Sequence, residues 1–300
     1  QPWPLTVKEG RRFVQAGEQG SRGAGERRSG GAEKRESITP VLGHPGPALV
    51  EAENVHFAYN GVRALSGVNV ELRPGEAVAL MGRNGSGKST LLKCLVGLLA
   101  PQQGEVRVNG RANRGRDVAD ICREVAYLPQ NPDDLLFAES VTEELTMTLR
   151  NHGLASRNGV AHLLDRLDLA EVAAAYPRDL SVGQRQRVAL GAVTITGPQV
   201  LLLDEPTRGL DYHAKENLVA IWRRWLAEGM SLLLVTHDVE LVARVADRVL
   251  ILSQGEIIAA GETAEVLSAS PLFAPQITRL FPGSGWLTVE DALAGLAVTE

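Results

Sequence analysis

Two patterns of hydrophobic and polar residues divide the chain. Apolar and polar residues alternate along Leu49–Tyr59 and Val68–Leu72, which is typical of antiparallel strands with one face on a core. Farther on, short uninterrupted apolar runs recur, as in strands that are buried on both faces. These runs predict strands at Ala77–Met81, Val125–Leu128, Val200–Leu203, Leu232–Val235 and Arg248–Leu252. Gly104–Gly110 is predicted to be a further strand, which lies between two turns. The pattern predicts an antiparallel β subdomain beside a parallel sheet.

Segments with helical spacing lie between the later apolar runs. Ala214–Glu228 and Val239–Val245 each carry apolar residues on one helical face, so strands and helices alternate in this part of the chain. Such alternation predicts an α/β fold, in which a parallel sheet has helices on both faces. Between about residues 131 and 181, three segments with helical spacing follow one another without a strand, namely Val141–His152, Gly159–Leu167 and Ala170–Ala175. This stretch predicts an inserted α-helical subdomain.

The beginning of the chain differs from the rest. Residues 1–47 hold nine glycines and eight Lys or Arg against five Glu, and residues 17–35 have almost no apolar content. We expect a disordered linker there, because such a composition cannot form a core. A basic arm that binds lipid or RNA is the alternative, which the interleaved glutamates disfavour. Residues 48–268 are predicted to form the globular domain, completed by Glu262–Leu267, and residues 269–300 a C-terminal tail.

A short repeat connects the two ends of the chain. Leu5-Thr6-Val7 and Leu287-Thr288-Val289 are each followed by two charged residues and have a tryptophan nearby. The first residue is Gln1 rather than Met. Together these features predict a tandem duplication, in which residues 1–16 are the end of a preceding module.

Composition and charge narrow the possible functions. The formal net charge of −5 over 300 residues gives no reason to expect nucleic acid as a partner. Two cysteines, Cys94 and Cys122, offer neither a disulfide framework nor the spacing of a metal site. No apolar run reaches the length of a membrane span. We therefore expect any membrane role to depend on a partner.

Residues 78–90, VALMGRNGSGKST, indicate a phosphate-binding loop. The spacing G-x-x-x-x-G-K-[ST] follows a buried strand and precedes a helical pattern, as this loop requires. Backbone N–H groups would converge on phosphate oxygens, Lys88 would reach the β- and γ-phosphates, and the Ser89 hydroxyl would hold Mg²⁺. The residues expected to bind the nucleoside triphosphate are Gly82, Arg83, Asn84, Gly85, Ser86, Gly87, Lys88, Ser89 and Thr90. A glycine-rich turn with a surface lysine is the alternative, which the flanking strand and helix disfavour.

A second chemical signal comes at the end of the Val200–Leu203 strand. Asp204 and Glu205 follow the apolar run directly, and the carboxyl ends of parallel strands are where ligands of such sheets bind. This arrangement suits a Walker B motif, in which Asp204 supports Mg²⁺ and Glu205 polarises the attacking water. Two solvated carboxylates at a strand end are the alternative, which the phosphate-binding loop disfavours.

Residues 180–188, LSVGQRQRV, precede a helical pattern that runs to about Thr196. They resemble the signature sequence of ATP-binding-cassette (ABC) ATPases, whose usual form is LSGGQ, with Val182 in place of a glycine. The resemblance implies that Ser181, Gly183 and Gln184 meet the γ-phosphate of ATP held by the phosphate-binding loop of a second ABC ATPase module. A plain helix-capping turn is the alternative.

The resemblance covers about residues 48–265 and implies the fold of a P-loop nucleoside triphosphatase. It implies that Tyr59 stacks on adenine and that Gln130 touches Mg²⁺. Asp211 would lie in the loop that communicates across the dimer, and His237 would contact the γ-phosphate. The alternatives are that Tyr59 is a core tyrosine and that His237 has a structural role. The chain is thus identified as a member of the ABC ATPases, which hydrolyse ATP with Mg²⁺, and its catalytic residues would be Lys88, Glu205 and His237.

Residues 130–137, QNPDDLLF, are similar to the QNPDDQLF segment of energy-coupling factor importers, with Leu135 in place of a glutamine. This resemblance implies a peripheral subunit on the cytoplasmic face of the cell membrane that energises uptake of a vitamin or a transition-metal ion. Its partners would be transmembrane scaffold and substrate-binding subunits and a second ATPase module, either another copy or a covalently linked one. Asp133 and Asp134 would face basic or N-terminal helix ends of the scaffold.

The rival interpretation is a soluble ABC protein that acts in translation, DNA repair or chromosome organisation. Such proteins usually carry long coiled coils, zinc motifs or basic linkers between domains. None of these features is visible in the sequence. The absence favours the importer subunit.

Overall fold

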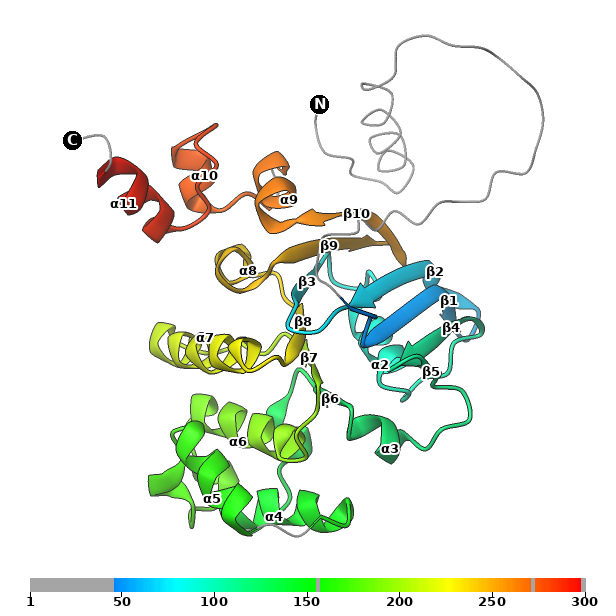
Figure 1. Ribbon diagram of the computed structural model, residues 1–300, viewed down its shortest axis with the longest axis vertical. Coiled ribbons are helices and arrows are strands. Elements are labelled where there is room, and N and C mark those ends of the chain that lie inside the picture. Colours follow the sequence, from blue (N-terminus) through cyan, green and yellow to red (C-terminus); the bar gives the residue numbers. More distant parts are fainter. Residues whose placement is uncertain (1–45, 155–156, 271–272, 298–300) are drawn as a thin grey trace.

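The computed structural model describes residues 46–154, 157–270 and 273–297. Within these ranges two sheets are packed against the helices that cover them (Figure 1). The predicted linker at residues 17–35 and the first copy of the repeat, Leu5-Thr6-Val7, lie outside the described residues. The predicted α/β architecture, with its antiparallel β subdomain and its inserted helical subdomain, is present.

The antiparallel β subdomain contains four strands in the order β2-β1-β4-β5. They are β1 (Val50–Tyr59), β2 (Val62–Leu72), β4 (Gln103–Val108) and β5 (Arg111–Ala112). Asn60 and Gly61 join β1 to β2 with φ angles of 47° and 83°, which is the backbone that a two-residue hairpin turn requires. Because the turn is this tight, β2 begins at Val62 rather than at the predicted Val68.

The second sheet has six strands in the order β10-β9-β3-β8-β7-β6. Five of them pair in parallel and carry the predicted apolar runs, namely β3 (Ala77–Met81), β6 (Val125–Leu128), β7 (Val200–Asp204), β8 (Ser231–Val235) and β9 (Arg248–Ser253). The sixth strand, β10 (Glu256–Glu262), pairs antiparallel with β9 and was not predicted. Gln254 and Gly255 form its turn with positive φ angles of 50° and 79°.

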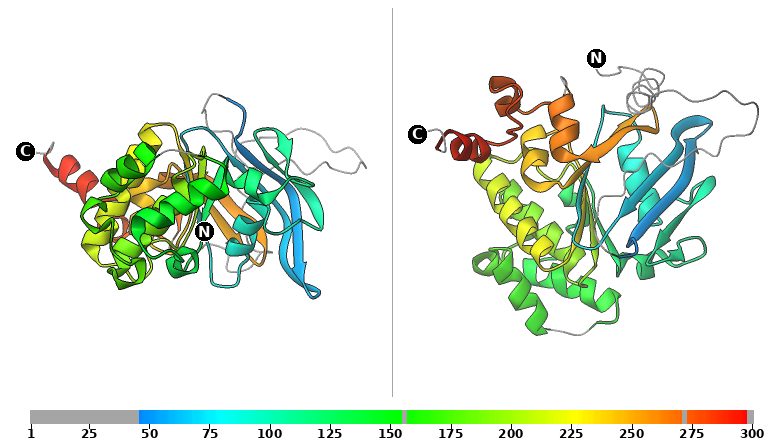
Figure 2. Two further views of the ribbon diagram at one scale, coloured as in Figure 1. Left: turned by 90° about the horizontal axis from the view of Figure 1, so that it is seen from below. Right: turned by 45° about the horizontal axis from the view of Figure 1, so that its top comes forward.

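Helices cover both faces of the parallel sheet (Figures 1 and 2). On one face, α2 (Lys88–Leu95) and α3 (Val118–Cys122) share a core with the antiparallel strands. On the other face lie α6 (Val182–Thr194), α7 (Tyr212–Ala227) and α8 (Val239–Val245). Strand β7 contributes to both cores, since Leu202 packs with the first group and Leu201 with the second. Its uninterrupted apolar run follows from burial on both faces.

The inserted subdomain contains α4 (Val141–Asn151) and α5 (Arg157–Arg166), with a 3₁₀ turn at Pro132–Leu135 before them. The predicted helix Ala170–Ala175 was wrong, because a single 3₁₀ turn, Ala170–Val172, is all that forms there. The carbonyl oxygens of Ala173 and Ala175 instead accept hydrogen bonds from the N–H groups of Thr142 and Val141 at 2.9 and 3.1 Å. These carbonyls thereby satisfy the first N–H groups of α4.

The end of the chain is helical and packs on the domain. It contains α9 (Thr263–Ala269), α10 (Gln276–Leu280) and α11 (Val289–Ala297). Leu287, in the second copy of the repeat, is buried with Leu267 of α9 and Met81 of β3. The predicted tail is therefore attached to the edge of the sheet through a small apolar core.

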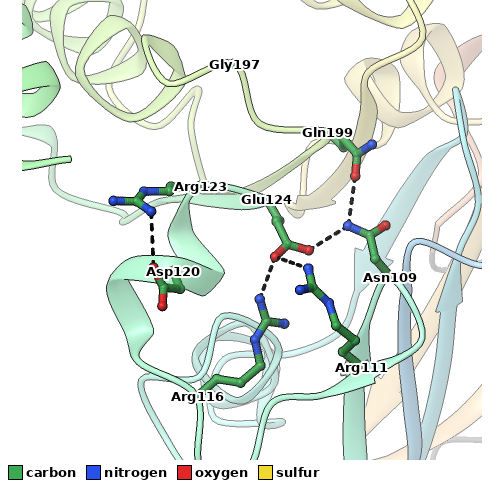
Figure 3. Close-up of a pocket in the computed structure, with 8 residues that line it drawn as sticks. All are labelled: Asn109, Arg111, Arg116, Asp120, Arg123, Glu124, Gly197 and Gln199. Carbon is green, nitrogen blue, oxygen red and sulfur yellow. Dashed lines mark hydrogen bonds and ion pairs between the residues drawn. The ribbon is translucent and has the colours of Figure 1, made fainter. Parts of the chain in front are cut away.

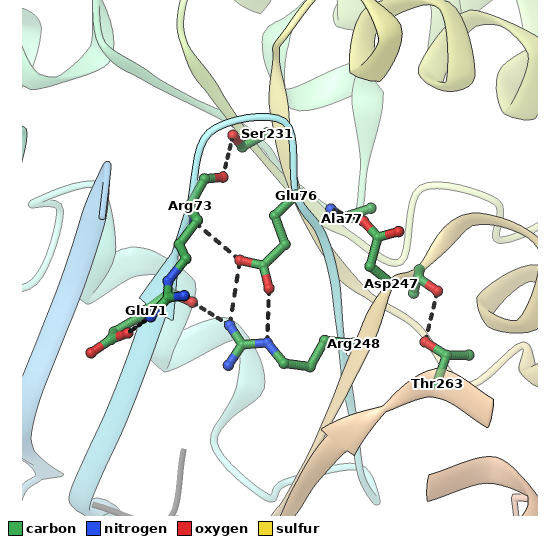
Figure 4. A network of polar contacts seen from close by, with 9 residues as sticks. Glu71, Arg73, Glu76, Ala77, Ser231, Asp247, Arg248 and Thr263 are labelled. Atoms are coloured by element: carbon green, nitrogen blue, oxygen red, sulfur yellow. Dashed lines mark hydrogen bonds and ion pairs between the residues drawn. The ribbon is translucent and has the colours of Figure 1, made fainter. Parts of the chain in front are cut away.

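A buried ion pair joins the two sheets at the edge where the parallel strands begin (Figure 4). The guanidinium Nε of Arg248 lies 2.8 Å from Oε1 of Glu76, and both side chains are buried. Arg248 Nη2 also donates to the carbonyl oxygen of Glu71 at 2.7 Å. Such a pair is strongly destabilising when only one partner is removed. It fixes the end of β2 against the start of β3 and β9, and so sets the frame for the opposite edge, where the site lies.

Candidate nucleotide-binding site

The loop between β3 and α2 has the backbone of a phosphate-binding loop. Gly82 has a φ of 148°, and a Cβ added there would lie 2.1 Å from the carbonyl oxygen of Leu252. Gly87 has a φ of 109°, and its added Cβ would lie 2.4 Å from the carbonyl oxygen of Ala64. At both positions a side chain would collide with backbone and would require a disfavoured conformation. These two glycines therefore allow the loop to wrap closely over its own domain.

Lys88 begins α2 and lies across this loop. Its Nζ donates to the carbonyl oxygens of Gly82 and Arg83 at 2.8 and 2.9 Å. Burial lowers the pKa of Lys88, against the opposite effect of the nearby carboxylates of Glu205 and Asp204. Within the described residues the buried Ser86 hydroxyl has no hydrogen-bond partner. A buried hydroxyl without a partner and a buried ammonium are donors that fit an anionic ligand such as a triphosphate.

Asp204 and Glu205 lie where β7 ends. Both carboxylates are buried, and the Tyr127 hydroxyl of β6 donates to Oδ2 of Asp204 at 3.3 Å. Glu205 has a left-handed backbone with a φ of 49°, and its N–H donates to the carbonyl oxygen of Val235 in β8 at 2.9 Å. The alternative of two solvated carboxylates is excluded by this burial.

His237 follows β8 and meets Glu205 directly. Its Nδ1 lies 3.0 Å from Oε1 and 2.9 Å from Oε2 of Glu205. The His237 side chain is 74% exposed, whereas that of Glu205 is 11% exposed. The imidazole thus lies over the carboxylate with most of its surface open. Two of the three predicted catalytic residues, Glu205 and His237, are therefore neighbours, and His237 is not buried in the core.

An ion pair beside His237 was not predicted. Lys215 of α7 lies 2.7 Å from Oδ2 of Asp238, whose Oδ1 accepts the N–H of Leu241 at the start of α8. Burial raises the pKa of Asp238, but the hydrogen bonds from Lys215 and Leu241 outweigh it and leave the pKa lowered. The cap of α8 and the Lys215 contact fix the segment that carries His237. The signal in the sequence was Asp238 as a helix N-cap before an apolar run.

The signature residues start α6. The Ser181 Oγ accepts the N–H of Gln184 at 3.3 Å, and the Gln184 Oε1 accepts the N–H of Ser181 at 3.0 Å, which is a capping box. A Cβ on Gly183 would lie 3.0 Å from that of Ala214 in α7. Val182 is exposed. A helix cap is therefore present, and α6 packs on the face of the sheet opposite to α2 (Figure 1).

Three further predicted positions lie at the ends of other elements. Tyr59 ends β1, is 45% exposed and makes an edge-to-face contact with Phe57, so it is not a core tyrosine. Gln130 is exposed just after β6. Asp211 caps α7, where its Oδ1 accepts the N–H of Ala214 at 2.8 Å. Gln130, Asp204, Glu205 and His237 thus lie at or just after the ends of the parallel strands β6, β7 and β8. Tyr59 ends a strand of the antiparallel sheet, and Ser181, Gly183 and Gln184 lie at the start of α6.

A cavity of about 650 Å³ lies at the opposite edge of the sheet (Figure 3). Arg111 and Arg116 both bond to Oε1 of Glu124, at 2.7 and 2.5 Å, and Asn109 Nδ2 donates to Glu124 and to Gln199. Burial raises the pKa of Glu124, yet the hydrogen bonds from Asn109 and Arg116 bring it below its usual value. The carboxylate neutralises the arginines and ties the β4–β5 hairpin to β6 and β7. This is a structural network and not the nucleotide site.

The described residues contain no helix that is long and apolar enough to cross a membrane. In the same ranges, no group of three or more His, Cys, Asp and Glu side chains is arranged to hold a metal ion. A Mg²⁺ ion is usually held by one or two carboxylates together with waters and substrate phosphates. The single carboxylate of Asp204, with the Ser89 hydroxyl and the Gln130 amide, fits that kind of site.

Comparison with known proteins gives consistent results. Residues 65–208 match the family model described as "ABC transporter". A putative ABC transporter ATP-binding protein of Streptomyces avermitilis is 48% identical over 79% of this chain and 42% of its own length. The nickel import ATP-binding protein NikO of Rhodobacter capsulatus is 40% identical over 78% of this chain and 96% of its own. The energy-coupling factor transporter ATP-binding protein EcfA of Methanothermobacter thermautotrophicus is 34% identical over 83% and 82%.

Two solved structures resemble the fold. One is cbiO1 from Clostridium perfringens, described as part of the ABC transporter complex cbiONQ, with a TM-score of 0.70 and 28% identity over 79% of this chain and 97% of that one. The other is the ATP-binding cassette MJ0796, a dimer bound to ADP and Pi, with a TM-score of 0.65 and 26% identity over 71% and 98%.

The fold, with its phosphate-binding loop between β3 and α2, is that of an ABC ATPase domain. The chain belongs to the family of ABC transporter ATP-binding proteins. It spans under half of the length of the Streptomyces avermitilis relative.

Proposed function

We propose that the chain is the ATP-hydrolysing subunit of an energy-coupling factor importer for a vitamin or a transition-metal ion. It acts as a peripheral subunit on the cytoplasmic face of the membrane, with transmembrane scaffold and substrate-binding subunits. The QNPDDLLF segment at residues 130–137 supports this subfamily. The similarity to EcfA, NikO and cbiO1 supports transport rather than the rival role in translation, DNA repair or chromosome organisation.

The observation that carries the proposal is that one chain holds two separate parts of the site. Lys88, Asp204 and Glu205 lie at the strand ends, whereas Ser181 and Gly183 begin a helix on the other face of the sheet. Because α6 and α2 pack on opposite faces of the sheet, we infer that the signature serves a second nucleotide-binding module. We therefore propose a head-to-tail pair with another ABC ATPase module, either a second copy or a linked one.

The residues of this chain divide the chemistry among them. Lys88 and the N–H groups of the phosphate-binding loop would hold the triphosphate, and Ser89, Asp204 and Gln130 would hold Mg²⁺. Bound Mg²⁺ neutralises developing charge on the phosphate oxygens. Glu205 accepts a proton from the attacking water as general base.

His237 orients the proposed base, Glu205, from the solvent-exposed side of the carboxylate. Its Nδ1, within 3.0 Å of both carboxylate oxygens, fixes how the Glu205 side chain lies. The exposed edge of the imidazole is free to meet the γ-phosphate. Because the buried carboxylate is oriented in advance, little reorganisation is needed at the moment of reaction.

Segment Asn131–Ala138 is proposed as the surface that receives the scaffold subunit. Phe137 is exposed there, and the two N–H groups of Phe137 and Ala138 are held by Oε2 of Glu144 at 2.7 and 2.8 Å. The acidic pair is less free than we expected from the sequence. Asp133 lies 2.9 Å from Arg185, and Asp134 accepts from Asn131 at 2.7 Å. A docking partner would therefore compete with contacts inside the chain.

The test of this function compares two substitutions in the full chain. Glu205→Gln removes the base but keeps the phosphate and Mg²⁺ contacts, so hydrolysis should fall about 10²–10⁴-fold. ATP should then persist and hold the paired state by mass action. Lys88→Ala removes a phosphate contact, so ATP binding should weaken and no pair should accumulate.

The measurements are ATP turnover, ATP binding by fluorescence titration, and mass by light scattering with ATP and Mg²⁺. Turnover of the Glu205→Gln protein at the unmodified rate would show that Glu205 is not the base. Co-purification with ribosomes or DNA, instead of with detergent-solubilised membrane subunits, would contradict the importer role.

A further inference from the structure

Arg185 lies in the first turn of α6 and has two partners outside its own turn. Its Nε lies 2.9 Å from Oδ1 of Asp133 in the 3₁₀ turn Pro132–Leu135. Its Nη1 donates to the carbonyl oxygen of Leu180 at 2.6 Å. Leu180 directly precedes Ser181, the cap of the signature helix. One guanidinium thus connects the turn after Gln130 with the residue that begins the signature.

The segment around Asp133 is held by the helical subdomain in two further places. Glu144 of α4 accepts the N–H groups of Phe137 and Ala138. Arg178, just before the signature, donates from Nη2 to the carbonyl oxygen of Leu136 at 3.3 Å. These contacts come from residues that flank or support α6. Segment Asn131–Ala138 and the start of α6 are therefore built to move as one piece.

From this geometry we propose that Arg185 is a positioning residue that passes displacement of segment Asn131–Ala138 to the start of the signature helix. The idea rests on the proposed function, in which that segment receives the membrane scaffold and the signature meets ATP on the second module. The Asp133 carboxylate is partly exposed, so a cationic group of the docking partner competes with Arg185 for it. Release of Arg185 loosens its hold on Leu180 and thereby on the cap of α6.

Hydrogen–deuterium exchange on the full chain tests this link without ATP or a membrane partner. The readout is the exchange rate of two backbone amides. The Gln184 N–H donates to the Ser181 Oγ, and the Arg185 N–H donates to the Ser181 carbonyl oxygen. Asp133→Asn keeps the size of the side chain but removes its charge. A partly exposed ion pair contributes only modestly, so we expect these amides to exchange roughly two- to five-fold faster.

The matched control is another ion pair of the same subdomain. Arg166 of α5 lies against Glu228 after α7, and their side chains are 24% and 50% exposed, close to the 21% and 43% of Arg185 and Asp133. Arg166→Gln should leave the Gln184 amide unchanged.

Two results would overturn the proposal: unchanged exchange in Asp133→Asn, or an equal effect of Arg166→Gln. A fall of the melting temperature in Asp133→Asn with uniformly faster exchange would also overturn it, because that result shows a merely structural role. Since the exchange measurement requires no hydrolysis, its failure is distinguishable from failure of the Glu205→Gln test.

Discussion

The left-handed backbone of Glu205 permits a test of whether this residue is held in place for function. Its φ is 49°, and most of the other non-glycine residues with a positive φ in the described part of the chain are asparagine or aspartate. Those two residue types adopt this region readily, whereas glutamate does so rarely. A residue with a Cβ loses about 1–2 kcal/mol in this conformation. The neighbouring strand retains it through the hydrogen bond to Val235. Strain maintained at a candidate general base is consistent with a functional constraint.

The perturbation is a pair of substitutions, Glu205→Gly and Glu205→Ala. Both remove the carboxylate and its contact with His237, but only alanine keeps the Cβ. Glycine ordinarily costs about 0.5–1 kcal/mol relative to alanine in regular structure. Here the left-handed penalty of about 1–2 kcal/mol works against alanine. With the middle of each range, the glycine variant is left more stable by about 0.5–1 kcal/mol, which reverses the usual order.

Thermal unfolding and urea titration of the two variants measure this difference. For a domain of this size, 0.5–1 kcal/mol corresponds to about 1–4 °C in Tm. Both variants lack the base, so their turnover should be equally low and stability alone should separate them. If the alanine variant unfolds at the same or a higher temperature than the glycine variant, the backbone at residue 205 is not strained and the reasoning fails.

Two further predictions follow from the site. Gly87→Ala should abolish ATP binding in a filter or fluorescence assay, because its Cβ would lie 2.4 Å from the Ala64 carbonyl oxygen. At Gly85 nothing lies within 4 Å of an added Cβ, so Gly85→Ala should cost only about 1–2 kcal/mol of strain. Equal effects of the two substitutions on ATP binding would contradict this prediction. Lys215→Met should reduce stability by at most about 1 kcal/mol at pH 7. Since Asp238 has a lowered pKa in the folded chain, its contribution is present above its unfolded value of about 4 and is lost as the pH falls through the folded one. The difference between Lys215→Met and the unmodified chain in urea midpoints should therefore shrink on acidification, and a constant difference would contradict the pairing.

Much of the fold could be predicted because its strands are buried on both faces. The runs that became β3, β7 and β8 are apolar at nearly every position, and runs this short favour buried strands over helices. The phosphate-binding loop was equally accessible, because the spacing of its glycines, Lys88 and Ser89 is a local motif, although the backbone that Gly82 and Gly87 approach belongs to Leu252 and Ala64. Both kinds of signal are contained within a dozen consecutive residues.

What could not be predicted depends on contacts between distant segments. Strand β10 carries weak alternation and exists because the Gln254-Gly255 turn folds it onto β9. The segment at residues 170–175 has helical spacing, yet its carbonyl oxygens cap α4 instead. The contacts of Tyr127 with Asp204 and of Asp133 with Arg185 join residues far apart in the chain. Pattern analysis identified the residue types there but not their partners.

The distribution of exposure across the site explains why pairing suits this domain. The proposed base Glu205 and the proposed Mg²⁺ ligand Asp204 are buried within one chain, but His237 and Val182 are open to solvent. A charge that develops on a phosphate beside such open groups is screened by water, so preorganised donors are worth less there. Covering the same groups with a second module excludes that water and strengthens each contact at once. The groups that remain exposed in one chain are thus those whose stabilisation of charge on the phosphate increases most when the proposed pair closes.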